Sequence, residues 1–355
     1  MRYSKLARRL LVRAQRQFVP GIYQDLFDRY TPDLVIASTP GWRYDRYLLR
    51  EAAAKGIPTA SVIVGWDNTS SYSLSGADMD WVTCWSEIQK EELVKGSDWE
   101  AAQVTVGGIP SYDGYINKRW LIDRQEYFRQ HDLDPERKLI SYANSFNSFS
   151  PNIQNIEALI RLVVGDKLSQ PSQLLIRLHP NHFMDVERFV QEREQIYKMA
   201  SEYPYVHVVE PVALGGSLGH YSGEDMPEKA SMMAHSDVFV TVYSTMAVEA
   251  SVLEKPVIAL TIDSPVGWPG KYYLPLSQIS GWPTHERFRM SNSGRVATTE
   301  QELLQHLEYY LANPQADLEA RREFVREECT FMDGSAGKRT AENILGMIEK
   351  GRYRK

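Results

Sequence analysis

Residues 238–260 limit most strongly what this chain can fold into. The segment opens with a run of β-branched and aromatic residues, turns at Tyr243-Ser244-Thr245, and continues with apolar residues at helical spacing. Lys255-Pro256 then ends the helix, and a second apolar run follows. The pattern predicts a buried strand, a tight turn, a helix and another buried strand, which together make a βαβ unit of a parallel sheet.

The start of this helix is also a candidate ligand site. Ser244 or Thr245 fits the N-cap position, and Glu249 lies one turn further on. The free N–H groups and the positive dipole end of such a helix attract a phosphate. The alternative is an ordinary βαβ unit in which these residues do no more than cap the helix.

Strand and helix patterns alternate along most of the chain. Apolar strands are expected at residues 33–37, 58–64, 81–85 and 103–106, and again at 138–143, 173–178 and 206–209. This alternation predicts an α/β protein with doubly wound parallel sheets and ligand loops at the carboxyl ends of the strands. Because 355 residues are many for one core, we expect two Rossmann-like domains facing a cleft.

The expected boundaries follow the interruption in this alternation. An N-terminal domain with leading helices should cover residues 1–115, a charged and aromatic linker residues 116–136, and a C-terminal domain with a helical tail residues 137–355. The N-terminal domain supplies only about four strands, so it is expected to be small or truncated.

Composition excludes several classes of function. A net charge of -6 argues against a nucleic-acid-binding protein, which needs excess cations. Two distant cysteines make neither a disulfide framework nor a metal site, and a cytoplasmic location is expected. No apolar run has the roughly 18 residues of a membrane span, and the charged start does not fit a signal peptide.

The first sixteen residues combine six cations with several leucines and no acidic residue. They predict a basic amphipathic helix. One alternative is that it rests on an anionic membrane surface, which would make the protein peripheral at the inner membrane. The other is that it packs on its own domain through its leucines.

Polar residues follow the predicted strands of the second domain. The loop after residue 143 is dense in hydroxyl and amide groups that suit phosphate oxygens. The next strand runs into Arg177-Leu178-His179-Pro180, where the proline keeps His179 extended. An imidazole there suits proton transfer or a phosphate charge. The glycine-rich loop 211–228, with His220, predicts either a mobile lid or a nucleotide pocket.

Several of these motifs occur in the order of a known family. They are the segment around His179, Tyr243-Ser244-Thr245 with Glu249, Lys255-Pro256-Val257-Ile258, and Asp333-Gly334 near the end. The chain resembles GT-B glycosyltransferases, most closely the CDP-glycerol glycerophosphotransferase and surface-polysaccharide branch. The non-hydrolysing UDP-N-acetylglucosamine 2-epimerases share that scaffold.

The resemblance implies roles for individual residues. Ser244 and Thr245 would contact the diphosphate of a nucleotide-diphosphate sugar, Glu249 would bind its ribose, and His179 would lie near the phosphates. Asp67 would accept the proton of the acceptor hydroxyl, unless it only caps its loop. The residues expected to bind the donor are Ser145, Asn147, Ser148, Arg177, His220, Ser244, Thr245 and Glu249, and those expected in catalysis are Asp67 and His179.

The predicted function is a metal-independent glycosyltransferase that acts on a surface-glycan or lipid-linked acceptor and uses no separate cofactor. Val242 stands where the glycerophosphotransferase branch usually has an acidic residue, which favours a sugar donor. Asp78-Met79-Asp80 has the spacing of a metal-binding motif but precedes a strand, so both carboxylates are expected to be solvated turn residues. The alternatives are a sugar-nucleotide epimerase and a non-catalytic binding protein with the same fold.

Overall fold

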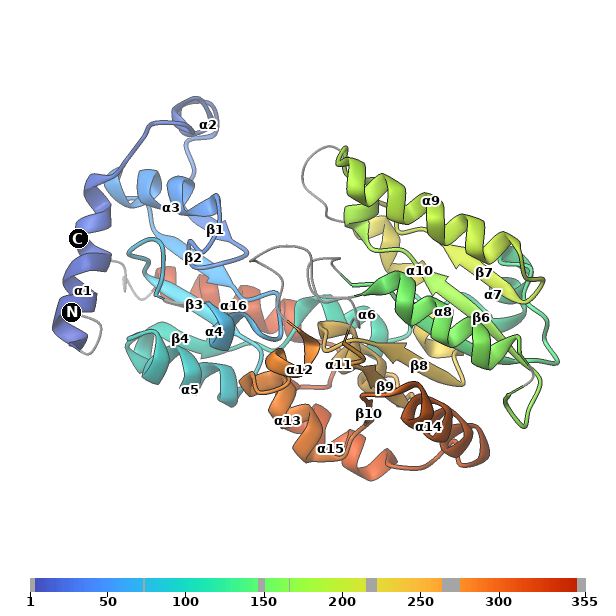
Figure 1. Cartoon of the computed structure of the whole chain (residues 1–355). Coiled ribbons are helices and arrows are strands. Elements are labelled where there is room, and N and C mark those ends of the chain that lie inside the picture. The colour runs from blue at the N-terminus through green and yellow to red at the C-terminus, as the bar shows by residue number, and fades with distance from the viewer. Residues whose placement is uncertain are drawn as a thin grey trace. The chain divides into compact units, whose positions relative to one another are not determined.

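The computed structural model describes residues 4–72, 74–145, 151–165, 167–214, 222–263 and 275–349. The chain forms two compact units. Unit 1 comprises Met1–Ile116 and Arg326–Lys355, and unit 2 comprises Asn117–Val325 (Figure 1). Each unit contains one sheet whose paired strands are all parallel, which confirms the predicted α/β class.

Unit 1 has its strands in sequence order, β1-β2-β3-β4. These are β1 (Val35–Ala37), β2 (Thr59–Val62), β3 (Trp81–Cys84) and β4 (Val104–Val106), all within the predicted segments. The accompanying helices are α1 (Lys5–Ala14), α2 (Gln24–Tyr30), α3 (Asp45–Ala54), α4 (Asn68–Ser71), α5 (Glu87–Gly96) and α6 (Asp113–Ile116). Its core includes Leu49, Ala52, Val82, Cys84 and Leu93, each fully buried.

The end of the helical tail belongs to unit 1, whereas we expected the tail to complete the C-terminal domain. Of its two helices, α15 (Leu318–Cys329) begins in unit 2 and passes into unit 1 at Arg326, and α16 (Ala336–Glu349) lies wholly in unit 1. Ile344 and Met347 of α16 pack with Ala60 and Trp81 of unit 1. Asp113 also accepts hydrogen bonds from the first backbone N–H groups of α16, at 2.9 and 2.8 Å. The apolar spacing of a helix shows that it has a packing face, but not which sheet that face covers.

Unit 2 has the strand order β10-β9-β8-β5-β6-β7. The strands are β5 (Lys138–Ala143), β6 (Ser172–Arg177), β7 (Val206–Val209), β8 (Val238–Thr241), β9 (Val257–Leu260) and β10 (Arg295–Ala297). The helices are α7 (Arg124–Gln130), α8 (Asn152–Val163), α9 (Glu187–Ser201), α10 (Met226–His235), α11 (Thr245–Val252), α12 (Leu276–Ile279), α13 (Pro283–Ser291) and α14 (Glu300–Ala312). Among these six strands only β10, three residues long, was not predicted, because so short a run has no clear period.

The expected linker is part of unit 2 rather than a connection outside both domains. Its helix α7 buries Tyr127 and Phe128, and the unit boundary falls at residue 117. The aromatic residues that made this stretch look unlike a βα repeat are therefore core residues, which bury large apolar areas.

The order of the strands indicates where unit 2 should bind a ligand. From β5 the chain adds β6 and β7 on one side, and then adds β8, β9 and β10 on the other. The direction of winding therefore reverses between β5 and β8, where Tyr142 pairs with Val240. In open parallel sheets, ligands bind outside the carboxyl ends of strands at such a reversal.

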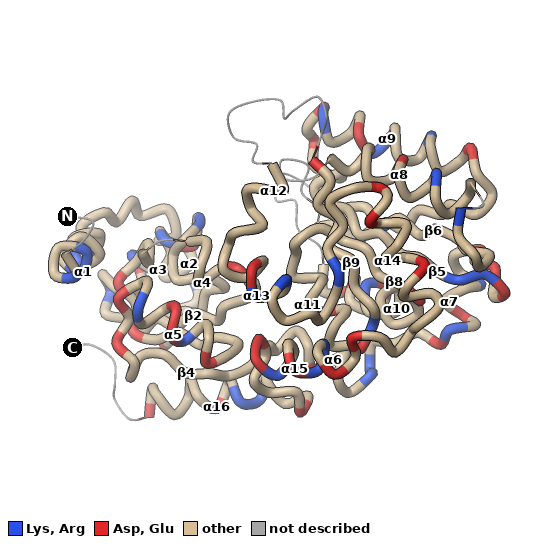
Figure 2. Tube along the Cα trace, turned by 60° about the horizontal axis from the view of Figure 1, so that its bottom comes forward, with Lys and Arg blue, Asp and Glu red and all other residues tan. Residues whose placement is uncertain are grey.

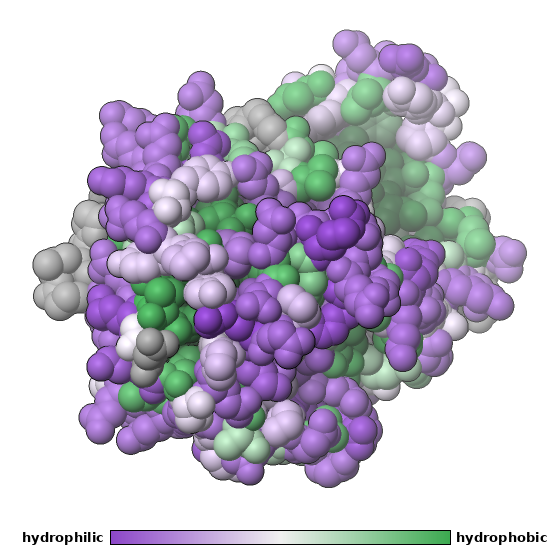
Figure 3. Space-filling view, turned by 90° about the vertical axis from the view of Figure 1, so that its right-hand side faces the viewer, coloured by the Kyte–Doolittle hydropathy of each residue, from purple (hydrophilic) through white to green (hydrophobic). Residues whose placement is uncertain are grey.

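Charged residues of both signs are spread over the chain (Figure 2). Hydrophilic side chains cover much of the face seen in Figure 3, with smaller apolar areas between them. Within the described ranges, no helix is both long enough and apolar enough to cross a membrane.

Asp78 and Asp80 are not the solvated turn residues that we expected. Asp78 is 9% exposed and forms an ion pair with Arg16 at 2.6 Å. Asp80 accepts hydrogen bonds from the backbone N–H and the hydroxyl of Thr59, at 2.9 and 3.1 Å. Both carboxylates therefore connect parts of unit 1. In the part of the chain that the structure describes, no group of three or more side chains is arranged to hold a metal ion.

Candidate functional site

The helix α11 begins at the carboxyl end of β8, as the sequence predicts. Ser244 has extended backbone angles, and its hydroxyl accepts a hydrogen bond from the N–H of Met246 at 3.0 Å. Thr245 is the first helical residue and is half-buried. No acidic residue lies in the first turn, so no carboxylate of this helix neutralises its positive end. This end of α11 suits an anionic group.

Asn144 follows β5, the strand next to β8, and has an unsatisfied side chain. The residue lies directly after the strand, two positions beyond the pair of Tyr142 and Val240, and is 6% exposed. Its backbone N–H donates to the carbonyl of Arg177 at 3.0 Å, but among the described residues neither atom of its amide group has a hydrogen-bond partner. A buried amide without a partner costs about 1–3 kcal/mol, which a ligand can recover by bonding to it.

Tyr243 presents a second unsatisfied group at the same edge. Its ring stacks on His285 with centroids 4.4 Å apart and meets the edge of Phe288. The residue is 7% exposed, and within the described ranges its buried hydroxyl has no hydrogen-bond partner. Burial raises the pKa of Tyr243 to about 12, so the hydroxyl stays protonated at neutral pH and can donate a hydrogen bond.

Neither Asn144 nor Tyr243 was among the site residues predicted from the sequence. Both occur directly after predicted strands. The missing information was that β5 and β8 are neighbours, because 95 residues separate Ser141 of β5 from Ser236, its hydrogen-bond partner just before β8. A polar residue directly after a strand becomes a site candidate only when the strand beside it is known.

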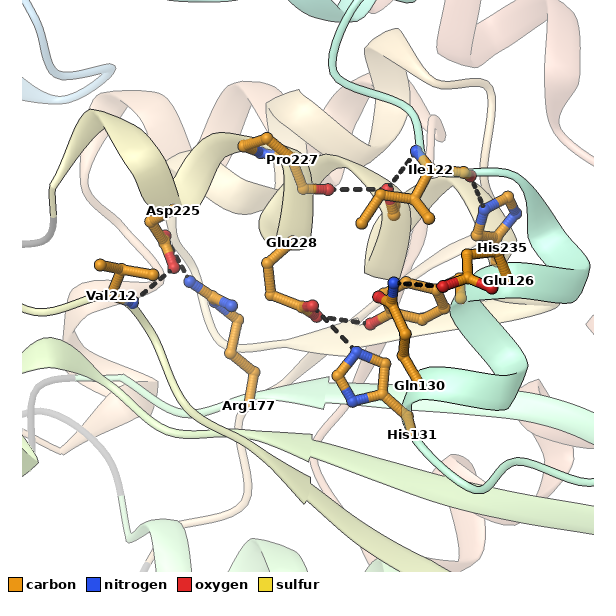
Figure 4. A network of polar contacts seen from close by, with 12 residues as sticks. Ile122, Glu126, Gln130, His131, Arg177, Val212, Asp225, Pro227, Glu228 and His235 are labelled. Carbon is orange, nitrogen blue, oxygen red and sulfur yellow. Dashed lines mark hydrogen bonds and ion pairs between the residues drawn. The ribbon is translucent and has the colours of Figure 1, made fainter.

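Arg177, a predicted donor-binding residue, forms a buried ion pair at the end of β6. Its Nη2 lies 2.5 Å from Oδ2 of Asp225, and the two side chains are 5% and 0% exposed (Figure 4). The other oxygen of Asp225 accepts from the backbone N–H of Val212 at 2.9 Å. Nη1 of Arg177 is buried and has no partner among the described residues. Nη2 of the guanidinium is therefore bonded within unit 2, and Nη1 can still donate a hydrogen bond.

The first turn of α10 holds two more charged residues, the half-buried Glu228 and the buried Lys229. Glu228 accepts from the hydroxyl of Tyr127 at 2.6 Å and contacts Nε2 of His131 at 2.9 Å (Figure 4). Lys229 pairs with Glu249 at 2.9 Å, and both side chains are almost fully buried. Because the carboxylate of Glu249 bonds to α10, its contact with a ribose stays a prediction.

His179 caps the short 3-10 helix Pro180–Phe183 after β6, in the extended conformation expected for a residue before proline. Its Nδ1 accepts from the backbone N–H of Asn181 at 3.2 Å, and the ring is half-buried. This bond requires Nδ1 to be unprotonated, so a proton on the neutral ring is carried by Nε2. The role of His179 in catalysis stays a prediction.

A chain of hydrogen bonds connects the loops after β5 and β6. His182 lies 3.2 Å from Glu192, and the same carboxylate oxygen accepts from Asn152 at 2.7 Å. Asn152 in turn accepts from the N–H of Ser145 and donates to its carbonyl, at 3.2 and 2.9 Å. Ser145 is therefore held through its backbone at the carboxyl edge of the sheet.

The remaining predicted site residues lie elsewhere. Asn147, Ser148 and His220 fall outside the described residues. Asp67 is in unit 1, directly before α4, where its carboxylate accepts from the hydroxyl of Ser71 at 2.9 Å. Unit 2 thus brings Ser145, Arg177, His179, Ser244 and Thr245 to one edge of its sheet. The role of Asp67 as a base stays a prediction.

Comparison with a family model decides the family. The model described as CDP-Glycerol:Poly(glycerophosphate) glycerophosphotransferase matches residues 67–346. The chain belongs to this family. The resemblance inferred from its motifs is therefore confirmed, and the family is one of transferases. A search of curated protein sequences finds no match.

Solved structures agree on the fold. The UDP-GlcNAc 2-epimerase from Neisseria meningitidis, bound to UDP-GlcNAc, has a TM-score of 0.61 at 17% identity over 91% of this chain and 78% of its own. The Staphylococcus aureus MnaA-UDP structure has a TM-score of 0.58 at 14% identity, and the match covers 96% of this chain and 79% of its own. The wall teichoic acid polymerase TagF has a TM-score of 0.53 at 14% identity, and the match covers 83% of this chain and 69% of its own. These likenesses confirm the predicted GT-B fold.

Proposed function

We propose that this protein transfers a group from a nucleoside-diphosphate-linked donor, which binds at the carboxyl ends of β5 and β8. The observation that carries the proposal is the pair of buried, unsatisfied polar side chains, Asn144 after β5 and Tyr243 between β8 and α11. Membership of a glycerophosphotransferase family supports it. Two of the structural neighbours, an epimerase and TagF, are described with UDP-GlcNAc and with CDPG.

The geometry suits a leaving group that gains negative charge. When an acceptor hydroxyl displaces the nucleotide, the bond to the leaving phosphate breaks and its electron pair stays on that phosphate. The N–H groups of α11 and the hydroxyl of Tyr243 are donors fixed in place before the reaction. Such preorganised donors stabilise developing charge in a site that excludes water. The acceptor proton goes to a base, for which Asp67 and His179 are the predicted candidates.

Two transferred groups are supported by different observations. The family match favours glycerol phosphate, whose transfer from CDP-glycerol breaks the diphosphate and releases CMP. Val242, in place of an acidic residue before Tyr243-Ser244-Thr245, favours a sugar, whose transfer releases a nucleoside diphosphate. We propose the sugar, with a surface-glycan or lipid-linked acceptor, as the first candidate. The nucleotide that the reaction releases distinguishes the two candidates: CMP indicates glycerol phosphate transfer, and a nucleoside diphosphate indicates sugar transfer.

The donor proposal is tested by ligand-induced stabilisation. At a concentration 100 times its Kd, a nucleotide that binds only the folded protein stabilises it by about 2.7 kcal/mol. We expect UDP, GDP or CDP, or one of their sugar or glycerol derivatives, to raise the melting temperature in this way. No response to any member of this panel would refute the proposal. An isomerised sugar nucleotide formed from donor alone would instead favour the epimerase.

A pair of variants tests the site itself. Tyr243→Phe removes only the unsatisfied hydroxyl, so the ligand-free protein should be as stable as the wild type or slightly more stable. Its affinity for the nucleotide should fall about tenfold, which corresponds to about 1.4 kcal/mol. Tyr309→Phe, on the exposed part of α14, is the matched control and should change neither quantity. Unchanged affinity in Tyr243→Phe would exclude this hydroxyl from the site.

A further inference from the structure

The amide of Asn144 requires a partner that a phosphate alone cannot provide. The residue is 6% exposed, and neither Oδ1 nor Nδ2 has a hydrogen-bond partner among the described residues. Oδ1 accepts and Nδ2 donates, and turning the amide over leaves the same two needs. The oxygens of an ionised phosphate only accept hydrogen bonds. A phosphate therefore satisfies Nδ2 but leaves Oδ1 buried without a donor.

The other polar groups at this edge of the sheet have simpler needs. Nη1 of Arg177 and the hydroxyl of Tyr243 are also buried without partners in the part of the chain that the structure describes. The guanidinium only donates, and the protonated hydroxyl of Tyr243 donates as well, so both suit phosphate oxygens. The N–H groups at the start of α11 are further donors. Asn144 is the group here that also needs a donor from the ligand.

Asn144 lies between the strands that carry these donors. On one side, Ala143 pairs with Arg177 of β6, and the backbone N–H of Asn144 donates to the carbonyl of Arg177 at 3.0 Å. On the other side, β5 pairs with β8, which Tyr243 follows. Neighbouring strands are about 4.8 Å apart. A ligand group that bonds to the amide is therefore a close covalent neighbour of any phosphate that the flanking donors hold.

The covalent structure of the candidate donors indicates what this group is, a step that rests on the proposed function. In a sugar nucleotide and in CDP-glycerol alike, the carbon bonded to a phosphate oxygen is followed by two carbons that each carry a hydroxyl or, in some sugars, an acetamido group. One member of such a pair can donate to Oδ1 while the other accepts from Nδ2. The paired hydroxyls of the ribose are further from the phosphates, because C5′ and C4′ both intervene.

We propose that Asn144 is a specificity-determining residue that binds this adjacent pair of hydroxyl or acetamido groups on the transferred group. The amide meets both of its needs on one donor molecule, which no phosphate or apolar group would allow. A site built to hydrogen-bond a hydroxyl rejects an analogue without it, because the buried polar atom is then left unpaired. Asn144 therefore selects the donor by its transferred group and takes no part in breaking the bond to phosphate.

Calorimetric titration of the full chain with matched ligands tests this role. The pairs are UDP with UDP-glucose, GDP with GDP-mannose, and CDP with CDP-glycerol, and the pair that binds the wild type is used. Asn144→Leu, which keeps the number and branching of the heavy atoms, should bind the complete donor about tenfold more weakly and the nucleoside diphosphate as the wild type does. Asn313→Leu, at the exposed end of α14, is the matched control and should bind both ligands normally.

A second measurement uses the wild type itself. A donor analogue with hydrogen in place of the hydroxyl next to the phosphate-bearing carbon should bind about tenfold more weakly than the complete donor. Asn144→Leu should bind the two equally. Because its amide has no partner among the described residues, Asn144 can be replaced by Leu without loss of melting temperature in the ligand-free protein.

The outcomes distinguish this inference from the proposed function. If none of the nucleotides binds the wild type, the proposed function fails and the inference fails with it. If a nucleotide binds but Asn144→Leu weakens the nucleoside diphosphate as much as the complete donor, the amide contacts the ribose, base or phosphates, and only the inference is overturned. Full affinity of the wild type for the deoxy analogue overturns it as well, whether or not Asn144→Leu folds.

Discussion

Replacing Asp225 by Asn tests the electrostatic arrangement behind the candidate site. The change keeps the shape of the side chain and an oxygen that can accept from the N–H of Val212. It removes the charge that faces Arg177 at 2.5 Å, in a pair whose side chains are 5% and 0% exposed. Arg177 then remains buried as a cation without its carboxylate partner.

The size of the effect follows from this burial. Two unit charges 2.5 Å apart attract by about 7 kcal/mol at an effective dielectric constant of about 20. Desolvation of both ions offsets much of this attraction in the intact pair. Removal of one partner, however, leaves the desolvation penalty of the other, and costs about 3–5 kcal/mol. In a unit of about 200 residues, this lowers the melting temperature by about 6–20 °C.

A double-mutant cycle measured by urea unfolding isolates the pair. Asp225→Asn and Arg177→Met should each lower the free energy of unfolding of unit 2 strongly. The double variant should lower it by much less than the sum of the two single effects. Lys338→Met, which removes a cation that is 77% exposed on α16, is the control and should stay within about 0.5 kcal/mol of the wild type. If Asp225→Asn lowers the free energy of unfolding by less than about 1 kcal/mol, the argument that this pair is buried and desolvated is refuted.

Three further predictions concern other parts of the chain. Burial raises the pKa of Cys84 to about 12 and raises that of Cys329 as well, so Ellman's reagent at about pH 8 should titrate neither thiol until urea unfolds the protein. Burial lowers the pKa of His207 below its ordinary 6.5, so the unfolded chain takes up this proton first and stability is lost as the pH falls below about 6.5. Unfolding midpoints measured between about pH 7 and 5 should therefore change less in His207→Gln than in the wild type. Asp113→Ala removes the acceptor at the start of α16 and should lower the free energy of unfolding by about 1–2 kcal/mol, whereas Asp113→Asn should lose less.

The strands that carry the candidate site could be predicted because their signal is local. The segment around Ser244 has an apolar run, a capping residue and a helical period within a few residues of one another, and it folds as β8, α11 and β9. Burial on both faces of a parallel sheet requires such runs. The family resemblance was likewise carried by short motifs in order, and it identified the family correctly.

The partners of the predicted residues could not be predicted. Arg177 and Glu249 were expected to face a ligand, and each is paired with a charge from the start of α10. Asn144 and Tyr243 became candidates only when β5 and β8 proved to be neighbours. These contacts join positions far apart in the chain, and no spacing in the sequence records them.

The N-terminal helix shows most clearly what the sequence determines and what only the tertiary structure decides. The sequence alone determines that α1 is amphipathic, because the side of a helix on which each residue lies follows from 3.6 residues per turn. Which side meets the protein depends on Asp78, Asp98 and Glu100, which the folding of unit 1 gathers beneath the helix. Ion pairs join partners that are distant in sequence, so only the tertiary structure could show that Arg8 and Arg9 face inward while Leu6, Leu10 and Leu11 are exposed.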